Sequence, residues 1–138
     1  MDADLKRAVE RELYNLPRYK ARLKNLNLDL IDHPRPDVVS GGGKGNLPGD
    51  PTGSIASREL DIKAKIVSLE AKIKRIENAL EALSESERKL IDLRYLSPQR
   101  YDNDYVKDVL AMSKSTYYQF REDVLETIAE IIGLSAGN

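Results

Sequence analysis

A heptad repeat over residues 55–83 most restricts what this chain can fold into. Its two apolar seams consist of Ile66, Ile73 and Leu80, and of Ile62, Leu69, Ile76 and Leu83. Apolar residues at every a and d position over three heptads predict one long α-helix packed along its length against another helix. With the helical patterns on either side, this repeat predicts an all-α fold.

The partner of the heptad seam is open from the sequence. Residues 1–32 carry a matching repeat at Val9, Leu16, Leu23 and Leu30. Pro17 interrupts it, and a proline in a helix interior costs about 3 kcal/mol, so we predict two helices, 3–15 and 17–31, or one kinked helix. The seam either packs against this segment in an intrachain hairpin or forms a dimeric coiled coil. In the coiled coil, the oligomerisation residues are Ile62, Ile66, Leu69, Ile73, Ile76 and Leu80.

Residues 33–54 contain four prolines and six glycines and are predicted to form a flexible linker. Their "GGGKG" stretch does not fit a phosphate-binding loop, because Lys44 is followed by Gly45 and no strand precedes it. Asp50 and Pro51 have the residue types of an N-cap and a first helical position. The long helix is therefore expected to begin at the end of this linker.

Composition argues against several functional classes. The chain has no cysteine and a single histidine, His33, so a disulfide framework, a zinc site and a histidine relay are not expected. No apolar run approaches 18 residues, and the N-terminus is polar and of mixed charge. We expect a soluble cytoplasmic protein that is not an enzyme and uses no cofactor or metal.

Residues 84–138 have the pattern of a compact helix-turn-helix unit. Ser84 and Glu87 form a capping box, and a helix follows until Pro98. A short helix "DYVKDVL", a turn at Ala111 and Met112, and a helix from Ser113 to Ile132 complete the unit. Gly133 stands where a helix C-cap glycine belongs.

The last of these helices, from Ser113 to Ile132, has residue types at its start that can read DNA. Lys114 can contact phosphate or guanine, Gln119 can pair with adenine, and Tyr118 can contact a thymine methyl group or a phosphate. Tyr117 is predicted to face the core, with Met112, Phe120, Val124, Leu125 and Ile128. The charge is unfavourable, since residues 84–138 carry seven basic and ten acidic side chains.

The stretches "LSESERKLIDLRYL" and "DYVKDVLAMSKSTYYQFREDVLETI" together resemble region four of bacterial sigma factors, which reads promoter DNA. With "LYNLPRYKARLKNL", the loop containing "DPT" and the long helix, the whole order of segments resembles the RinA and ArpU regulators of phages. The resemblance implies DNA contacts at Lys114, Ser115, Tyr118 and Gln119. The remaining predicted DNA-binding residues are Ser113, Arg121, Arg88 and Lys107.

The predicted organisation is a packing or oligomerisation segment at 1–32, a linker at 33–54, the heptad helix at 55–83 and the DNA-binding unit at 84–138. The resemblance implies an activator of phage late or packaging genes that binds double-stranded DNA as a homo-oligomer. Two alternatives remain. One is a DNA-packaging protein of the small-terminase type, and the other is a helical oligomer whose sigma-like unit binds RNA polymerase rather than bases.

Overall fold

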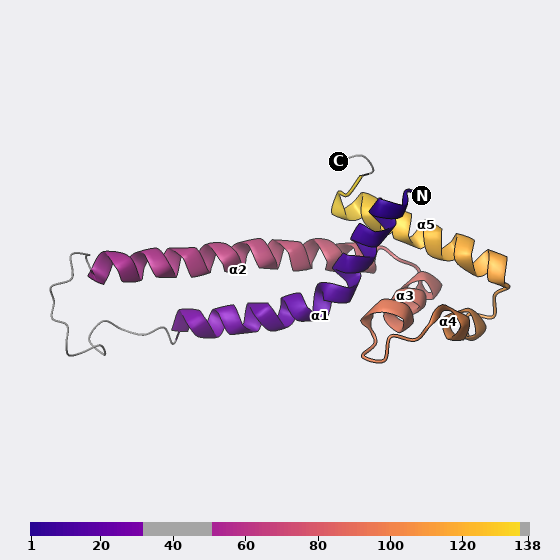
Figure 1. The fold of residues 1–138 in the computed structure, drawn as a ribbon, viewed down its shortest axis with the longest axis horizontal. Helices are drawn as coiled ribbons and strands as arrows, with labels where there is room; N and C mark the ends of the chain where they lie inside the picture. Colours follow the sequence, from indigo (N-terminus) through magenta and orange to yellow (C-terminus); the bar gives the residue numbers. More distant parts are fainter. Residues whose placement is uncertain (32–50, 136–138) are drawn as a thin grey trace. The chain divides into compact units, whose positions relative to one another are not determined.

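The computed structural model describes residues 1–31 and 51–135, with side chains described from residue 56 onward in the second range, and this part of the chain is all helical (Figure 1). The helices are α1 (Ala3–Ile31), α2 (Pro51–Glu81), α3 (Glu85–Ile91), the π-helical turn η3 (Asp92–Leu96), α4 (Asn103–Val109) and α5 (Lys114–Ile132). The predicted all-α fold is confirmed. The chain forms two compact units. Met1–Arg18 and Lys72–Asn138 make up one unit, here called the C-terminal unit, and Tyr19–Ala71 makes up the other, here called the hairpin unit.

Helix α1 runs without interruption through Pro17, so of the two predicted alternatives a single helix is found and two separate helices are not. The helix is stabilised by burial on both sides of the proline. Val9, Leu13 and Leu16 are at most 4% exposed before it, and Leu26 is 3% exposed after it. Burying an aliphatic side chain contributes about 1.5–3 kcal/mol, so these residues together outweigh the cost of one interior proline.

In the hairpin unit, the heptad seam of α2 packs against α1 of the same chain. Leu26, Ile62 and Ile66 form its buried cluster, with Leu23, Leu30 and Leu69 packed around them. The rest of the seam lies in the C-terminal unit, where Ile73, Ile76 and Leu80 are also buried. The intrachain hairpin is thus the arrangement that the structure shows, and oligomerisation through the six seam residues stays a prediction.

The start of α2 agrees in part with the predicted caps. Pro51 is its first residue, so residues 51–54 of the predicted linker belong to this helix. The predicted N-cap Asp50 and the rest of the linker lie outside the described residues. Within α2, Lys65 forms an ion pair with Asp61, one turn earlier in the same helix, at 3.2 Å. None of the described helices is both long enough and apolar enough to cross a membrane.

The C-terminal unit follows the predicted capping pattern. The Ser84 hydroxyl accepts a hydrogen bond from the Glu87 backbone at 3.3 Å, and the Glu87 carboxylate accepts one from the Ser84 backbone at 2.8 Å. At the other end, the Gly133 C-cap has a left-handed φ of 88°. Helix α4 begins at Asn103, where the Asp102 carboxylate caps it by accepting from the Tyr105 backbone at 2.9 Å.

The helix that begins with α3 does not continue to its end as an α-helix. The last five residues, Asp92–Leu96, form a π-helical turn, and the Ser97 backbone donates to the Asp92 carbonyl at 2.7 Å. A π-turn contains one more residue than an α-turn, so it rotates the side chains that follow it. Tyr95 lies in this turn and is 1% exposed. No pattern in the sequence predicted the π-helical turn in which Tyr95 lies.

The core of the C-terminal unit combines segments from both ends of the chain. Val9, Leu13 and Leu16 of α1 are buried in the same compact unit as the C-terminal helices. The buried residues of those helices are Leu90, Ile91, Tyr95, Val106, Tyr117, Val124, Leu125, Ile128 and Ala129. The predicted boundary at residue 84 therefore does not coincide with the compact unit, which also takes in the first 18 residues and the end of α2.

Candidate nucleic-acid interface

The start of α5 is capped and open to solvent. The Ser113 hydroxyl accepts from the Thr116 backbone at 3.3 Å and bonds the Thr116 hydroxyl at 2.9 Å. Lys114 and Ser115, in the first turn, are both exposed. Because backbone N–H groups in a first helical turn point outward without helical partners, this end of α5 favours an anion such as a phosphate.

A tight turn connects α4 to α5, at the place where the helix-turn-helix was predicted. Ala111 adopts a left-handed φ of 56°, and the Met112 backbone donates to the Lys107 carbonyl at 3.1 Å. Only three residues separate the end of α4 at Val109 from Ser113, which caps the next helix. Such a tight connection allows the first helix to lie across a DNA backbone while the second enters the major groove.

The adjacent tyrosines have different environments, as predicted. Tyr117 is fully buried, and its hydroxyl donates to the Asn103 side-chain oxygen at 2.7 Å. Tyr118 is 38% exposed and meets the Tyr117 ring edge to face at 5.2 Å. The Tyr117–Asn103 bond ties the start of α5 to the start of α4, and Tyr118 presents its ring to solvent. Of the other predicted core residues, Val124, Leu125 and Ile128 are buried, and Met112 and Phe120 are partly buried.

Gln119 is exposed and its orientation is fixed by a neighbour. Its amide nitrogen donates to the Asp123 carboxylate at 2.9 Å. Both residues line a shallow hollow of about 430 Å³ beside the start of α5, together with Ser115, Thr116 and Phe120. A carboxylate at this place can accept from the amino group of cytosine but repels phosphates. The hollow therefore has groups for base contact and little charge for backbone contact.

Arg121 was predicted to contact DNA, and its burial shows that this prediction is wrong. It lies in the interior at 9% exposure, where its guanidinium bonds the Glu10 carboxylate at 2.6 Å and the Tyr95 hydroxyl at 3.1 Å. The sequence did contain a signal for this position. Arg121 stands four residues after Tyr117 and four before Leu125, on the face of α5 that was predicted to be buried.

The other two predicted basic contacts lie on different helices. Arg88, on α3, forms an exposed ion pair with Asp92 at 2.9 Å. Lys107, on α4, is 24% exposed, with its ammonium 3.2 Å from the Asp108 carboxylate. The low exposure of the Lys107 side chain indicates that its methylene stem is covered while its ammonium reaches the Asp108 carboxylate. Each ammonium or guanidinium has an acidic partner, which weakens its attraction for phosphate.

A polar network that the sequence did not reveal joins α1 to the helix-turn-helix. The Tyr95 hydroxyl donates to Glu10 at 2.7 Å and accepts from Arg121, so the three side chains satisfy one another. Beside them, Arg94 donates to the Tyr14 hydroxyl at 2.8 Å and to Asn103 at 3.0 Å. Since Asn103 also accepts from Tyr117, the network continues from α1 into both helices of the helix-turn-helix.

Burial and charge fix the protonation states in this network. Burial raises the pKa of the Tyr95 phenol far above its usual range, with the Glu10 carboxylate adding to the rise and Arg121 opposing it. Burial also raises the pKa of Tyr117. For Arg121, burial lowers the pKa, but the interactions with Tyr95 and Glu10 outweigh it, so the net pKa is raised. At neutral pH Tyr95 is therefore a neutral phenol and Arg121 a guanidinium.

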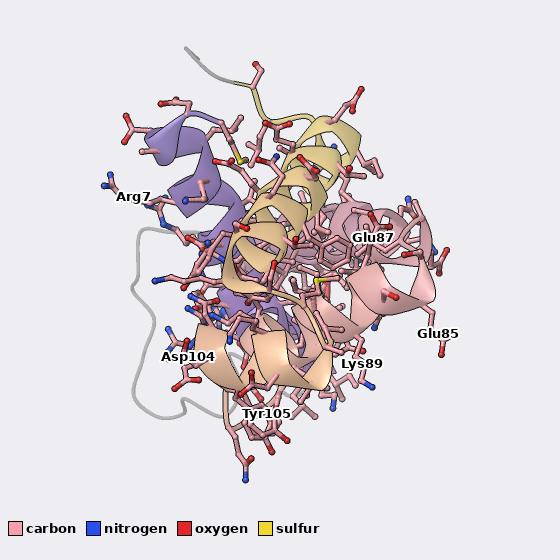
Figure 2. The ribbon with its side chains drawn as sticks, turned by 90° about the vertical axis from the view of Figure 1, so that its right-hand side faces the viewer. Arg7, Glu85, Glu87, Lys89, Asp104 and Tyr105 are labelled. Atoms are coloured by element: carbon pink, nitrogen blue, oxygen red, sulfur yellow. The ribbon has the colours of Figure 1, made fainter. Side chains whose placement is uncertain are left out.

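Two further observations bear on the chemistry available to the chain. Among the described residues, no three histidine, aspartate or glutamate side chains are gathered as a metal site would require. Figure 2 shows Asp104 and Tyr105 projecting from the outer side of α4. Tyr105 is 47% exposed and stacks on Tyr101 at 4.4 Å.

Comparison of the chain with protein families, with curated proteins and with solved structures finds no match.

Proposed function

We propose that the chain is a sequence-specific DNA-binding protein whose α4–turn–α5 unit reads the major groove. One observation carries the proposal: α5 begins exposed and capped directly after a tight turn, with Lys114, Ser115, Tyr118 and Gln119 all open to solvent. These side chains supply a cation, hydroxyl groups and an amide, which are the groups that contact phosphates and base edges.

The network behind α5 supports this function by holding the reading end rigid. Tyr117, on the buried face, is bonded to Asn103 of α4, and Arg121, one turn later, is bonded to Glu10 of α1. A reading helix fixed at two successive turns loses little conformational freedom on binding, so more of the contact energy remains as affinity. Arg121 would therefore contribute to DNA binding by fixing the position of α5 rather than by contacting DNA.

The resemblance to the RinA and ArpU regulators extends the proposal to activation of phage late or packaging genes by a homo-oligomer. Charge supports the oligomer. One reading end with Lys114 as the cation of its first turn binds weakly at physiological salt, because phosphate neutralisation supplies most non-specific affinity. Two linked reading ends recover affinity through effective concentration. Light scattering at micromolar concentration tests this part, and a strict monomer would remove it.

Selection of binding sites from random duplex DNA, followed by fluorescence anisotropy on the selected sequence, tests the DNA-binding function. Lys114→Ala combined with Gln119→Ala is expected to weaken specific binding at least tenfold, since each good base contact is worth about 1–3 kcal/mol. Lys89→Ala combined with Gln99→Ala is the matched control, because it removes the same two residue types from exposed positions outside α5.

The results separate the proposed function from its two alternatives. Equal binding by the double variant and its control would contradict the assignment of these contacts. Specific DNA binding without activation in a transcription assay would favour a packaging protein of the small-terminase type. Capture of RNA polymerase without enrichment of any DNA sequence would favour the polymerase-binding alternative.

A further inference from the structure

A groove on the C-terminal unit gathers arginines that do not belong to α5. It has a volume of about 360 Å³ and is lined by Arg7, Glu10, Arg11, Tyr14, Asn15, Arg18 and Arg100. All but Arg100 come from α1, and Arg100 lies in the connection that leads into α4. Four guanidinium groups against one carboxylate make this groove strongly basic on a chain whose net charge is −1.

The spacing of the arginines places them along one face of α1. Arg7, Arg11 and Arg18, with Tyr14 between them, stand at intervals of four, three and four residues, which return to the same side of a helix. Such a row follows a line of negative charge better than it encloses a compact ligand. Arg7 projects from α1 on the opposite side of the unit from the acidic Glu85 and Glu87 of α3 (Figure 2).

The fourth arginine is held in the groove by Tyr14. The Arg100 guanidinium lies 4.7 Å from the centre of the Tyr14 ring, and it donates to the Tyr14 carbonyl at 3.4 Å. The hydroxyl of the same tyrosine is fixed by Arg94. Arg100 is therefore positioned before any ligand arrives, and less side-chain entropy is lost when it binds an anion.

The single carboxylate in the groove is already engaged. Glu10 accepts from Arg121 at 2.6 Å and from Tyr95 at 2.7 Å on the inner side of α1. Arg7 shares an exposed ion pair with Asp4 at 3.1 Å, which water screens. For Arg11 and Arg18, the described part of the chain shows no ion pair, and both side chains are exposed. These two arginines are the cations most available to an anionic partner.

We propose that this groove binds the phosphodiester backbone of duplex DNA next to the site that α5 reads. The inference rests on the proposed DNA-binding function and deepens it. The groove borders α4 through Arg100, three residues before that helix begins, and the first helix of a helix-turn-helix crosses the DNA backbone. Guanidinium groups bind phosphate through paired N–H donors, independently of base sequence. The groove thus supplies the backbone charge that α5 lacks.

The dependence of DNA affinity on salt tests the inference. Each phosphate contact adds about 0.9 to the slope of log affinity against log salt concentration. Arg11→Ala combined with Arg18→Ala is expected to lower that slope by about 1.8, on the selected and on random DNA alike. The affinity lost relative to wild type should then be about 12-fold larger at 50 mM than at 200 mM salt. The ratio of specific to random binding should stay unchanged.

Three further double variants serve as comparisons for the salt dependence. Arg58→Ala with Lys63→Ala removes the same charge from exposed positions of the hairpin unit and is expected to keep the wild-type slope. Arg11→Lys with Arg18→Lys retains the charge and should keep most of the slope. Lys114→Ala with Gln119→Ala should instead lower the ratio of specific to random binding. Circular dichroism and the thermal midpoint verify that each variant is folded, as expected for exposed positions.

The outcomes distinguish this inference from the proposed function. If Arg11→Ala with Arg18→Ala keeps the slope of its control while specific binding persists, the groove proposal is overturned and DNA reading by α5 stands. An unchanged slope with loss of activation would also overturn it, and would assign the groove to an acidic protein partner. Absence of duplex binding by the wild-type chain overturns both together.

Discussion

The Glu10–Tyr95–Arg121 triad gives the sharpest prediction about stability. The side chains of Arg121 and Glu10 are only 10% and 17% exposed, and their charged atoms are 2.6 Å apart. Arg121→Met keeps an unbranched apolar stem but removes the guanidinium. The Glu10 carboxylate then remains enclosed with the Tyr95 hydroxyl, at 2.7 Å, as its one remaining donor within the triad.

The cost follows from that geometry. Removing one partner of a buried ion pair costs about 3–5 kcal/mol, because the other charge stays buried without compensation. Since Glu10 keeps the Tyr95 donor and some contact with water, we expect the lower end, about 3 kcal/mol. At about 3 °C per kcal/mol for a chain of this size, the thermal midpoint should fall by about 9 °C.

Arg88→Met is the matched control. Arg88 and Asp92 also form an ion pair, at 2.9 Å, but their side chains are 43% and 50% exposed. An exposed pair contributes about 0–1 kcal/mol, so the control should shift the midpoint by at most about 3 °C. Near-ultraviolet circular dichroism of tyrosine is a suitable signal, because the chain has no tryptophan and six of its seven tyrosines belong to the C-terminal unit.

A second set of variants tests the triad as a unit. Glu10→Leu with Arg121→Met removes both charges but leaves the buried Tyr95 hydroxyl without its two partners, which costs about 1–3 kcal/mol. Adding Tyr95→Phe removes that hydroxyl, so the triple variant should be more stable than Arg121→Met alone. Equal thermal midpoints for Arg121→Met and Arg88→Met would refute the reasoning, since they would mean that the Arg121 pair is solvated.

Three further predictions concern alkaline stability, the turn and the reading face. Tyr95 and Tyr117 have raised pKa values in the folded chain, so their contribution to stability is complete below the unfolded value of about 10 and is lost as the pH rises above it. Tyr95→Phe should therefore flatten the fall of the urea midpoint above pH 10, and an unchanged fall would contradict this. Ala111→Gly should raise the free energy of unfolding by about 0.5–1 kcal/mol, since glycine removes the left-handed strain of about 1–2 kcal/mol and loses part of that gain to unfolded-state entropy. A lower thermal midpoint would argue against a strained turn. Asp123→Asn should strengthen binding to random duplex DNA severalfold in anisotropy, by removing a negative charge beside Gln119, and unchanged affinity would place Asp123 away from phosphates.

The features that sequence predicts well are local. Ser84 with Glu87, Ser113 and Gly133 lie at the helix ends where capping chemistry placed them, and the apolar spacing in α5 distinguished Tyr117 from Tyr118. Each of these depends on residues within about four positions along the chain, so one sequence contains the needed information.

The features that sequence misses depend on distant partners. Arg121 is a charged residue on an apolar face, and what stabilises it there is Glu10, 111 residues away. Tyr95, which bonds both of them, lies in a π-helical turn that no local pattern predicted. The arginine groove was missed for a related reason, since three of its arginines precede Arg100 by more than 80 positions along the chain.

The shared core of the chain's two ends has a consequence for how the protein is made. Residues Val9, Leu13 and Leu16 leave the ribosome long before α5 exists, yet they are buried in one unit with it. At about 5–20 residues per second, the 111 residues that follow Glu10, up to and including Arg121, take about 6–22 s to synthesise. Through that interval the first turns of α1 must remain soluble with an uncovered apolar face. The C-terminal unit therefore cannot be completed until α5 has been synthesised, and nascent chains stalled before α5 should be protease-sensitive throughout residues 1–18.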